Sequence, residues 1–280
     1  MRFDLRVRHI SLQKRTRLFA IYAGVLCVLI LVGVSTYSLE KRNGSAAEYV
    51  STYAPPKPLF PRVSDFGGLL KQNTQVVFSV LGDSTGNEVN EWVHLLANKI
   101  AFDFAKTVTI HDWSDETNSY LASSTIGDGG NGPVSIWNGS VAGADARYVT
   151  EHIAALLPEP SDLVLFNLGH NYISPGAAIQ GQSNLLITIR KQWPENRSAI
   201  AITLQNPRLD SSEAKQASKV NALRSTFSGR ADVSVIDVWS AFVCSPELSP
   251  LLRTDGFNPS DAGQKLWMSV ASQALGVDGS

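Results

Sequence analysis

The sequence predicts an α/β fold in which a central parallel sheet lies between two layers of helices, preceded by one transmembrane helix. From about residue 74 onward, short β-branched runs alternate with amphipathic stretches. This alternation is typical of a parallel sheet that helices cover on both faces. A separate uncharged apolar stretch near the N-terminus predicts the membrane helix. Together these observations predict a three-layer α/β/α sandwich attached to a membrane anchor.

The composition indicates a folded protein without a nucleic-acid partner. The chain has 280 residues, of which 44% are hydrophobic and 18% are charged, and its formal net charge is −1. This length accommodates one α/β domain of roughly 200 residues together with additional segments. Binding to phosphates requires a basic face, and the near-zero total charge gives no sign of one. We therefore expect no contact with nucleic acid.

Residues 18–39 contain no charged side chain and are long enough to cross a bilayer. About 20 apolar residues span the ~30 Å hydrocarbon core, whereas the apolar part of a cleaved signal peptide is only about 7–15 residues long. Small residues at 45–47 leave cleavage as the alternative to a retained anchor. Six basic residues and one acidic residue precede the segment. This bias predicts a cytoplasmic N-terminus and an extracytoplasmic domain, at the cell surface or in the periplasm.

The chain therefore divides into a basic tail (1–17), a signal anchor (18–39), a stalk (40–73) and a globular domain (74–280). Four prolines between residues 55 and 61 favour an extended, stiff stalk. A Gly-rich insertion within 112–132 either lines the cleft or lies on the surface. In the domain, we expect strands near 76–81, 107–113, 134–138, 162–169, 198–204 and 233–238, and helices near 88–105, 145–157, 177–192, 211–227 and 261–275.

Polar motifs follow three of the expected strands, and in parallel sheets the chemistry lies at these carboxyl ends. Gly82-Asp83-Ser84 follows the first strand, where a serine hydroxyl lies beside the N–H groups of a helix N-terminus, as a nucleophile for acyl transfer requires. The segment ending at Gly143 follows the third strand, and Asn171 follows the fourth, where its amide can donate to an oxyanion. Taken singly, each motif is equally explained by a turn with a polar cap.

A fourth motif, 254–259, precedes the last helix, and the four together resemble the sequence blocks of the SGNH/GDSL hydrolases, a family of serine esterases and lipases. The resemblance implies that Ser84 is the nucleophile and that Asp83 supports it. It also implies an oxyanion hole made of the Ser84 amide, Gly143 and Asn171. Tyr172 replaces the aspartate that usually follows this asparagine.

The last family block has the pattern D-G-x-H-P, and here Asn258 stands at the position of the catalytic histidine, three residues after Asp255. A neutral amide cannot accept a proton near pH 7. Losing a general base costs ~10²–10⁴ in rate, and ~10⁶ when the base belongs to a triad. Two substitutes are considered: His170, which adjoins Asn171, and Asp255, provided that its pKa is raised. His94 and His152 are expected to be packing or surface residues.

Three functions remain open. The first is a membrane-anchored serine esterase or deacetylase acting on acyl esters of envelope glycans or lipids, with activity reduced by Asn258. The second is a non-catalytic protein that binds ester-bearing glycans, and the third is an acyltransferase of envelope polysaccharide. We favour the first, because the nucleophile, the oxyanion set and Asp255 are intact. The expected partners are an acylated glycan, a lipid or a small ester. No cofactor or metal is expected, because the histidines and acids show no ligand spacing.

Overall fold

The computed structural model describes residues 60–195 and 198–278. Its strands are β1 (Val76–Gly82), β2 (Thr107–Ser114), β3 (Ser119–Tyr120), β4 (Ser124–Ile126), β5 (Pro133–Ser140), β6 (Leu163–Asn167), β7 (Ala199–Leu204) and β8 (Ser234–Asp237). Its helices are α2 (Phe66–Leu70), α3 (Trp92–Asp103), α4 (Ala146–Glu151), α5 (Ile153–Leu156), α6 (Pro175–Gln192), α7 (Glu213–Phe227), α8 (Val238–Val243) and α9 (Asp261–Ala274), with 3-10 turns η1 (Val63–Asp65) and η2 (Ser249–Leu251).

The strands form one mostly parallel sheet in the order β3-β2-β5-β1-β6-β7-β8, with β4 paired to β2. All neighbours from β2 to β8 along this order run parallel, and only the short β3 and β4 are antiparallel to β2. Every residue of β1 and β6 is buried, as expected for central strands that helices cover on both faces. The predicted α/β class with a parallel sheet is confirmed.

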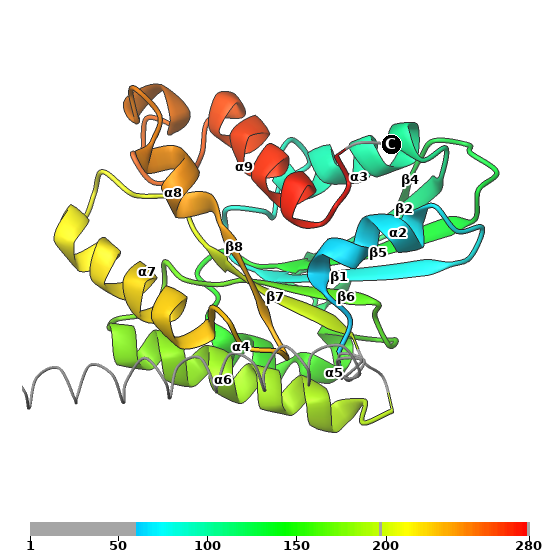
Figure 1. Ribbon diagram of the computed structural model, residues 1–280, viewed down its shortest axis with the longest axis horizontal. Helices are drawn as coiled ribbons and strands as arrows, with labels where there is room; N and C mark the ends of the chain where they lie inside the picture. Colours follow the sequence, from blue (N-terminus) through cyan, green and yellow to red (C-terminus); the bar gives the residue numbers. More distant parts are fainter. Residues whose placement is uncertain (1–59, 196–197, 279–280) are drawn as a thin grey trace, which may run out of the picture. The chain divides into compact units, whose positions relative to one another are not determined.

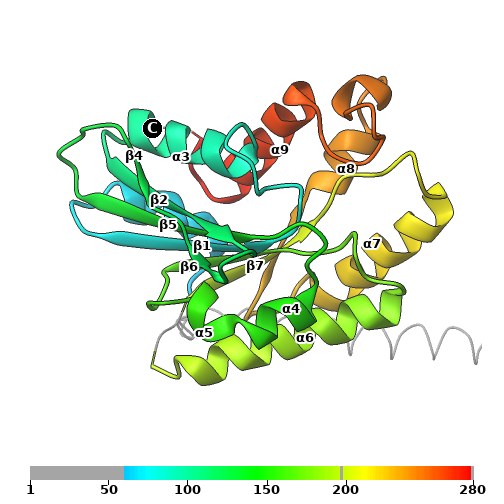
Figure 2. The same ribbon diagram turned by 180° about the vertical axis from the view of Figure 1, so that it is seen from behind.

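Two separate cores hold the helices to the sheet. In Figures 1 and 2, α2, α3, α8 and α9 cover one face, and α4, α5, α6 and α7 cover the other. On the first face Trp92 and Trp267 stack, with ring centroids 5.9 Å apart. On the second face Phe166 packs in a cluster with Leu185 and Phe227. Three layers result, in agreement with the prediction.

The Gly-rich insertion extends the sheet at its edge. Within residues 112–132, β3 and β4 pair with β2, which has β5 on its other side. Tyr120 fixes this edge, because its hydroxyl donates to the Leu156 carbonyl at 2.7 Å. Two further details differ from the expected elements. The helix expected at 145–157 is divided into α4 and α5 at His152, and α8 directly follows β8.

Residues 60–73, which the sequence pattern assigned to the stalk, belong to the folded unit. Phe66 and Leu70 are buried in the core of the α3 and α9 layer. Gly67 lies so close to the C-terminal turn that a Cβ on it would stand 1.9 Å from the Gly276 carbonyl oxygen. The predicted membrane segment, 18–39, lies outside the described residues. Within 60–195 and 198–278, no helix has both the length and the apolar character needed to cross a membrane.

An ion cluster ties the loop after β1 to the loop before α9. Arg253 Nη2 lies 3.0 Å from Glu88 Oε2 and 3.2 Å from Glu91 Oε1. Glu91 is fully buried, and its Oε2 accepts the Glu88 N–H at 3.0 Å. Burial raises the pKa of Glu91 to about 7, although the N–H of Glu88 and the charge of Arg253 act in the opposite direction. The contact between these two loops is therefore sensitive to pH near neutrality.

We predict that the contribution of Glu91 to the free energy of unfolding falls as the pH rises from about 4.5 to about 7. The raised pKa means that the folded state holds the Glu91 proton more tightly than the unfolded state. The stabilisation that this proton gives is complete at a pH below the pKa of Glu91 in the unfolded state. It is lost at a pH above the pKa of Glu91 in the folded state, and it amounts to at most about 3 kcal/mol. Glu91→Gln should remove this part of the pH dependence in urea unfolding, whereas the exposed Glu247→Gln should not. An unchanged pH dependence in Glu91→Gln would contradict the assignment.

Candidate active site

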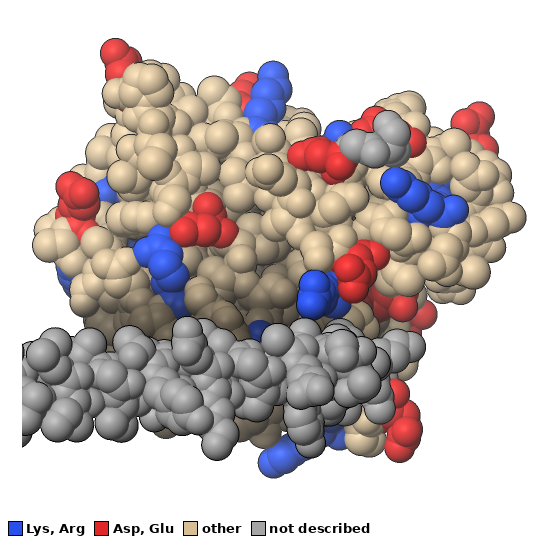
Figure 3. Space-filling view, viewed as in Figure 1, with Lys and Arg blue, Asp and Glu red and all other residues tan. Residues whose placement is uncertain are grey.

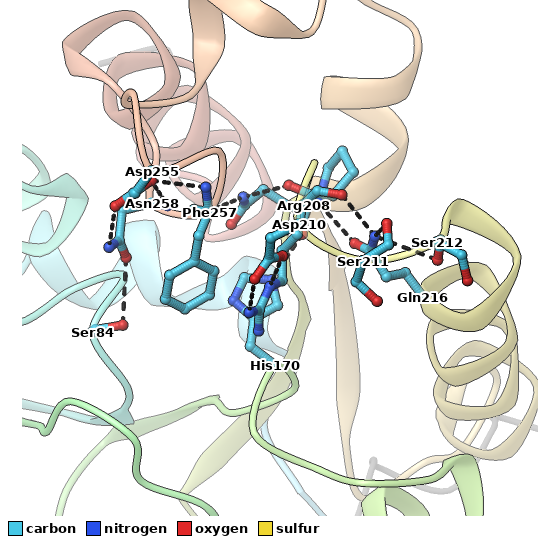
Figure 4. A network of polar contacts seen from close by, with 12 residues as sticks. Ser84, His170, Arg208, Asp210, Ser211, Ser212, Gln216, Asp255, Phe257 and Asn258 are labelled. Atoms are coloured by element: carbon cyan, nitrogen blue, oxygen red, sulfur yellow. Dashed lines mark hydrogen bonds and ion pairs between the residues drawn. The ribbon is translucent and has the colours of Figure 1, made fainter.

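Ser84, Asn258 and Asp255 form a chain of hydrogen bonds (Figure 4). Ser84 lies on the loop between β1 and α3, where it is partly exposed, and its Oγ donates to Asn258 Oδ1 at 3.4 Å. Asn258 Nδ2 in turn donates to Asp255 Oδ2 at 2.9 Å. The order of hydroxyl, amide and carboxylate corresponds to that of a serine–histidine–aspartate triad with the central imidazole replaced. The structure thus brings together the three residues that the sequence singled out as catalytic.

Asp255 organises the loop that carries Asn258. Its Oδ1 accepts the N–H groups of Phe257 at 2.8 Å and of Asn258 at 2.9 Å. Burial acts to raise the pKa of Asp255, but these hydrogen bonds and the one from the Asn258 side chain outweigh it and leave the pKa below its ordinary value. The raised pKa that a direct general base would need is therefore not found. Asp255 is instead a stable carboxylate that orients residue 258.

Asp83 supports the nucleophile loop from beneath. Its side chain is fully buried, and Oδ1 accepts from the N–H of Thr85 at 3.1 Å and from the Thr85 hydroxyl at 2.8 Å. Its Oδ2 accepts from Gln205 Nε2 at 2.9 Å. A buried carboxylate requires such donors to offset the loss of hydration. The contacts of Asp83 fix the backbone on either side of Ser84, which is the supporting role expected from the sequence.

Gly143 and Asn171 lie on loops that leave the strands on either side of β1. Gly82, at the end of β1, is level with Ser140 in β5 and with Asn167 in β6. Asn171 Nδ2 donates to the Ala144 carbonyl at 2.9 Å, which joins the two flanking loops. One N–H of this amide remains for a ligand, because the group has two. Gly143 has a φ of +78°, and a Cβ there would meet no atom within 4 Å, so its backbone borders open space.

His170 packs beside the site without contacting Ser84. Its Nε2 lies 2.8 Å from the Asn206 carbonyl, which can only accept, so Nε2 carries the proton. Its ring packs on Phe257 at 5.1 Å between centroids. Burial lowers the pKa of His170, although the charge of Asp83 opposes this effect. These contacts give His170 a packing role and do not support it as a substitute base.

Two of the other histidines also have structural contacts. His94 is buried, and its Nε2 lies 3.0 Å from Asp112 Oδ1, while Asn138 donates to the same oxygen at 2.9 Å. His152 Nδ1 lies 2.9 Å from the Tyr148 carbonyl, one helical turn earlier. Both agree with the expected packing role.

Two residues near the site were missed in the sequence. Gln205 links three parts of the site, because it also accepts the His170 N–H at 2.7 Å and donates to the Asn167 carbonyl at 3.0 Å. It directly follows β7, so the rule that chemistry lies at strand ends was sufficient to find it. Lys219 on α7 donates to the carbonyls of Gly169, His170 and Tyr172 at 3.1–3.3 Å and so holds the loop that carries Asn171. No local pattern marks Lys219.

Several solved structures share this fold. A lipase/acylhydrolase from Enterococcus faecalis is 14% identical, with a TM-score of 0.53 over 72% of this chain and 96% of that one. A two-domain esterase active on acetylated mannans is 14% identical, with a TM-score of 0.52 over 74% of this chain and 50% of that one. A carbohydrate esterase of family 3 from Talaromyces cellulolyticus is 20% identical, with a TM-score of 0.50 over 71% of this chain and 94% of that one.

The sequence itself matches a family model over most of the α/β domain. A search of curated proteins finds no match in sequence. The model for the GDSL-like lipase/acylhydrolase family matches residues 80–266, which include Ser84, Gly143, Asn171, Asp255 and Asn258. This range is more than half of the 280 residues and covers all four motifs. Together with the fold and the contacts of Ser84, the match shows that the chain belongs to the GDSL-like lipase/acylhydrolase family.

Proposed function

We propose that this protein is a membrane-anchored, extracytoplasmic serine esterase or deacetylase that acts on acyl esters of envelope glycans or lipids, at a rate limited by Asn258. The observation that carries the proposal is the chain from the Ser84 hydroxyl through Asn258 to the Asp255 carboxylate. Similarity in fold to an esterase active on acetylated mannans and to a carbohydrate esterase favours a glycan ester as substrate. The anchor and the location rest on residues 18–39 and the basic residues before them.

In the proposed reaction the Ser84 oxygen attacks the carbonyl carbon of the ester, and the carbonyl oxygen becomes an oxyanion. The amides of Ser84, Gly143 and Asn171 would stabilise this oxyanion, a contribution of about 10²–10³ in rate for each donor in comparable sites. Asn258 accepts the hydrogen bond of the hydroxyl and orients it but cannot take its proton. Water at the partly exposed Ser84 takes the hydroxyl proton. Collapse of the oxyanion then breaks the bond to the alcohol oxygen of the ester, which leaves with a proton from that water, and the acyl group stays on Ser84. A second water attacks this acyl-enzyme, releases the carboxylic acid and returns a proton to Ser84. This route predicts slow turnover.

Asn258 also favours a second candidate, a protein that binds acylated glycans without hydrolysing them. The same hydrogen bond that orients Ser84 holds its hydroxyl proton, and none of the described histidines is in contact with that hydroxyl. Under this alternative the loops around Ser84 retain an ester but leave it intact. The two candidates differ in whether any product is released.

We expect the full-length protein to hydrolyse p-nitrophenyl acetate slowly and to lose this activity in Ser84→Ala. The exposed Ser64→Ala serves as the matched control and should turn over substrate at the wild-type rate. Release of p-nitrophenolate under steady-state conditions measures the effect. Hydrolysis that persists in Ser84→Ala would refute the proposed nucleophile. Saturable binding of an acetylated oligosaccharide without any Ser84-dependent product would favour the non-catalytic alternative.

Asn258→His should raise kcat/KM by about 10²–10⁴, because an imidazole between Ser84 and Asp255 can accept and return the proton. The lowered pKa of Asp255 keeps its carboxylate ionised at neutral pH, ready to orient that imidazole. The gain should appear as the pH rises through the imidazole pKa, about 6.5. Rates for wild type, Asn258→His and the double variant with Ser84→Ala measure it. A gain that survives the loss of Ser84, or no gain at all, would contradict the inherited geometry.

A further inference from the structure

A cavity of about 370 Å³ lies beside the loop that carries Asn171, on the side facing α7. Ser84 and Asn258 do not line it, but Phe257 connects it to them. The Phe257 ring packs on His170 and lies 3.9 Å below the Arg208 guanidinium, while the next residue receives the Ser84 hydrogen bond. Figure 4 shows this ring between Ser84 and the Arg208–Asp210 pair. The Phe257 ring therefore lies between a group bound in the cavity and an ester bound at Ser84, and Asn171 also lines the cavity.

The cavity wall carries more positive than negative charge. Arg208, Lys215 and Lys219 line it together with one acid, Asp210. Asp210 neutralises Arg208, with Arg208 Nε 2.7 Å from Asp210 Oδ1. Lys219 donates only to neutral carbonyls, and Lys215 is exposed and has no salt bridge among the described ion pairs. Two ammonium charges, one helical turn apart on α7, are thus left without a counter-charge in the wall.

These cations act on one another across the cavity. Burial lowers the pKa of the Lys219 ammonium, and the charges of Arg208 and Lys215 lower it further, although the charge of Asp83 opposes them. Burial is also the largest cause that lowers the pKa of His170. The charges of Arg208 and Lys219 add to that effect, against the charge of Asp83. Mutual repulsion of this kind is relieved when an anion binds among the cations. In contrast, on the face shown in Figure 3 basic and acidic residues are interspersed.

The remaining wall fits a ring or hydrocarbon segment beside the anion. Val220, Leu223 and Trp239 contribute apolar side chains, and Ser211 adds a hydroxyl. Ligand sites typically combine such an apolar lining with a few polar groups that fix the orientation of the ligand. A sugar ring that bears a negative charge provides both the ring and the anion that such a wall would hold.

We propose that this cavity is a subsite for an anionic group, a carboxylate or a phosphate, carried by a sugar next to the acylated position. The preferred substrate would then be an acidic acylated glycan, and this identification of the substrate rests on the proposed esterase function. Anion binding itself does not depend on hydrolysis. Lys215 and Lys219 attract the anion, and Asn171 lines the cavity on the side of the reaction site.

Binding to the full-length protein by isothermal titration calorimetry tests the proposal with three probes of similar size. D-glucuronate and D-glucose 6-phosphate carry the two possible anions, and D-glucose is the neutral match. We expect saturable binding of at least one anionic sugar, about tenfold or more tighter than that of glucose, and weaker at high salt. Whether glucuronate, the phosphate or both bind distinguishes the two sources of charge, and each of these results supports the proposal.

Lys215→Gln should weaken binding of the anionic sugar by about tenfold, and Lys215→Glu should weaken it further. The exposed side chain of Lys215 makes these variants compatible with folding, which thermal unfolding checks. Lys265→Gln on α9 removes the same charge outside the cavity and should leave the affinity unchanged. Equal affinity for glucose and both anionic sugars, no binding of either anion, or indifference to Lys215→Glu would overturn the proposal.

The two hypotheses fail separately. Binding of an anionic sugar that depends on Lys215, without any product that depends on Ser84, refutes the esterase and leaves the subsite standing. Turnover that depends on Ser84, without binding of either anionic sugar, refutes the subsite and leaves the esterase standing.

Discussion

The hydrogen bond from Ser84 to the Asn258 side chain is the contact on which the site depends, and it joins residues 174 positions apart in the chain. Two loops must meet for it to form, one after β1 and one before α9. Arg253 holds them together through Glu88 and the buried Glu91. Gln264 of α9 contacts the helix that follows this loop, because its Oε1 accepts the N–H of Trp92, the first residue of α3, at 2.9 Å. The position of the reactive hydroxyl therefore follows from the packing of α3 against α9.

The parallel sheet explains why the remaining groups gather at this point. β5, β1 and β6 are neighbours that run in the same direction, so the loops bearing Gly143, Ser84 and Asn171 leave the sheet at the same edge. A network of buried polar side chains beneath them, centred on Asp83 and Gln205, fixes the loops bearing Ser84 and Asn171 relative to one another. The Asn171 amide joins the loop bearing Gly143 to them through the Ala144 carbonyl. Such a network specifies one arrangement, because a buried polar group left without a partner is costly.

On the proposed assignment of Asn258 to the position of the family's histidine, its contacts indicate what an asparagine changes there and what it preserves. Asn258 keeps both hydrogen bonds that an imidazole would make, to the hydroxyl on one side and to Asp255 on the other. It lacks only the basic lone pair that accepts a proton. The contacts thus keep hydroxyl, amide and carboxylate in line but supply no base for the proton, and both the proposed slow hydrolysis and binding alone are compatible with them.

The sequence predicted most of the central sheet and the order in which the site motifs occur along the chain, because strands and motifs are both recognised from neighbouring residues. Apolar runs predicted β1 and β6, which the structure confirms. The four motifs predicted Ser84, Gly143, Asn171, Asp255 and Asn258 as site residues, and all of them lie within the range that the family model matches. What it missed depends on long-range contacts. The short strands β3 and β4 are exposed or only half-buried and form only because β2 offers a free edge. Phe66 lies in a segment whose composition is typical of a stalk, and only its packing in the core assigns it to the folded unit. Lys219 holds the loop that carries Asn171 only through hydrogen bonds to carbonyls some 50 residues away.

In the proposed site, the Ser84 hydroxyl and the amides of Ser84, Gly143 and Asn171 surround one oxyanion. A crystal structure of the protein with a boronic acid, which adds reversibly to a serine hydroxyl, would show whether they do. We expect a tetrahedral boronate on Ser84 with one oxygen within about 2.7–3.1 Å of the Ser84 and Gly143 backbone nitrogens and of Asn171 Nδ2. A boronate on Ser84 whose oxygens all point to solvent, or a Gly143 N–H turned away from Ser84, would contradict it.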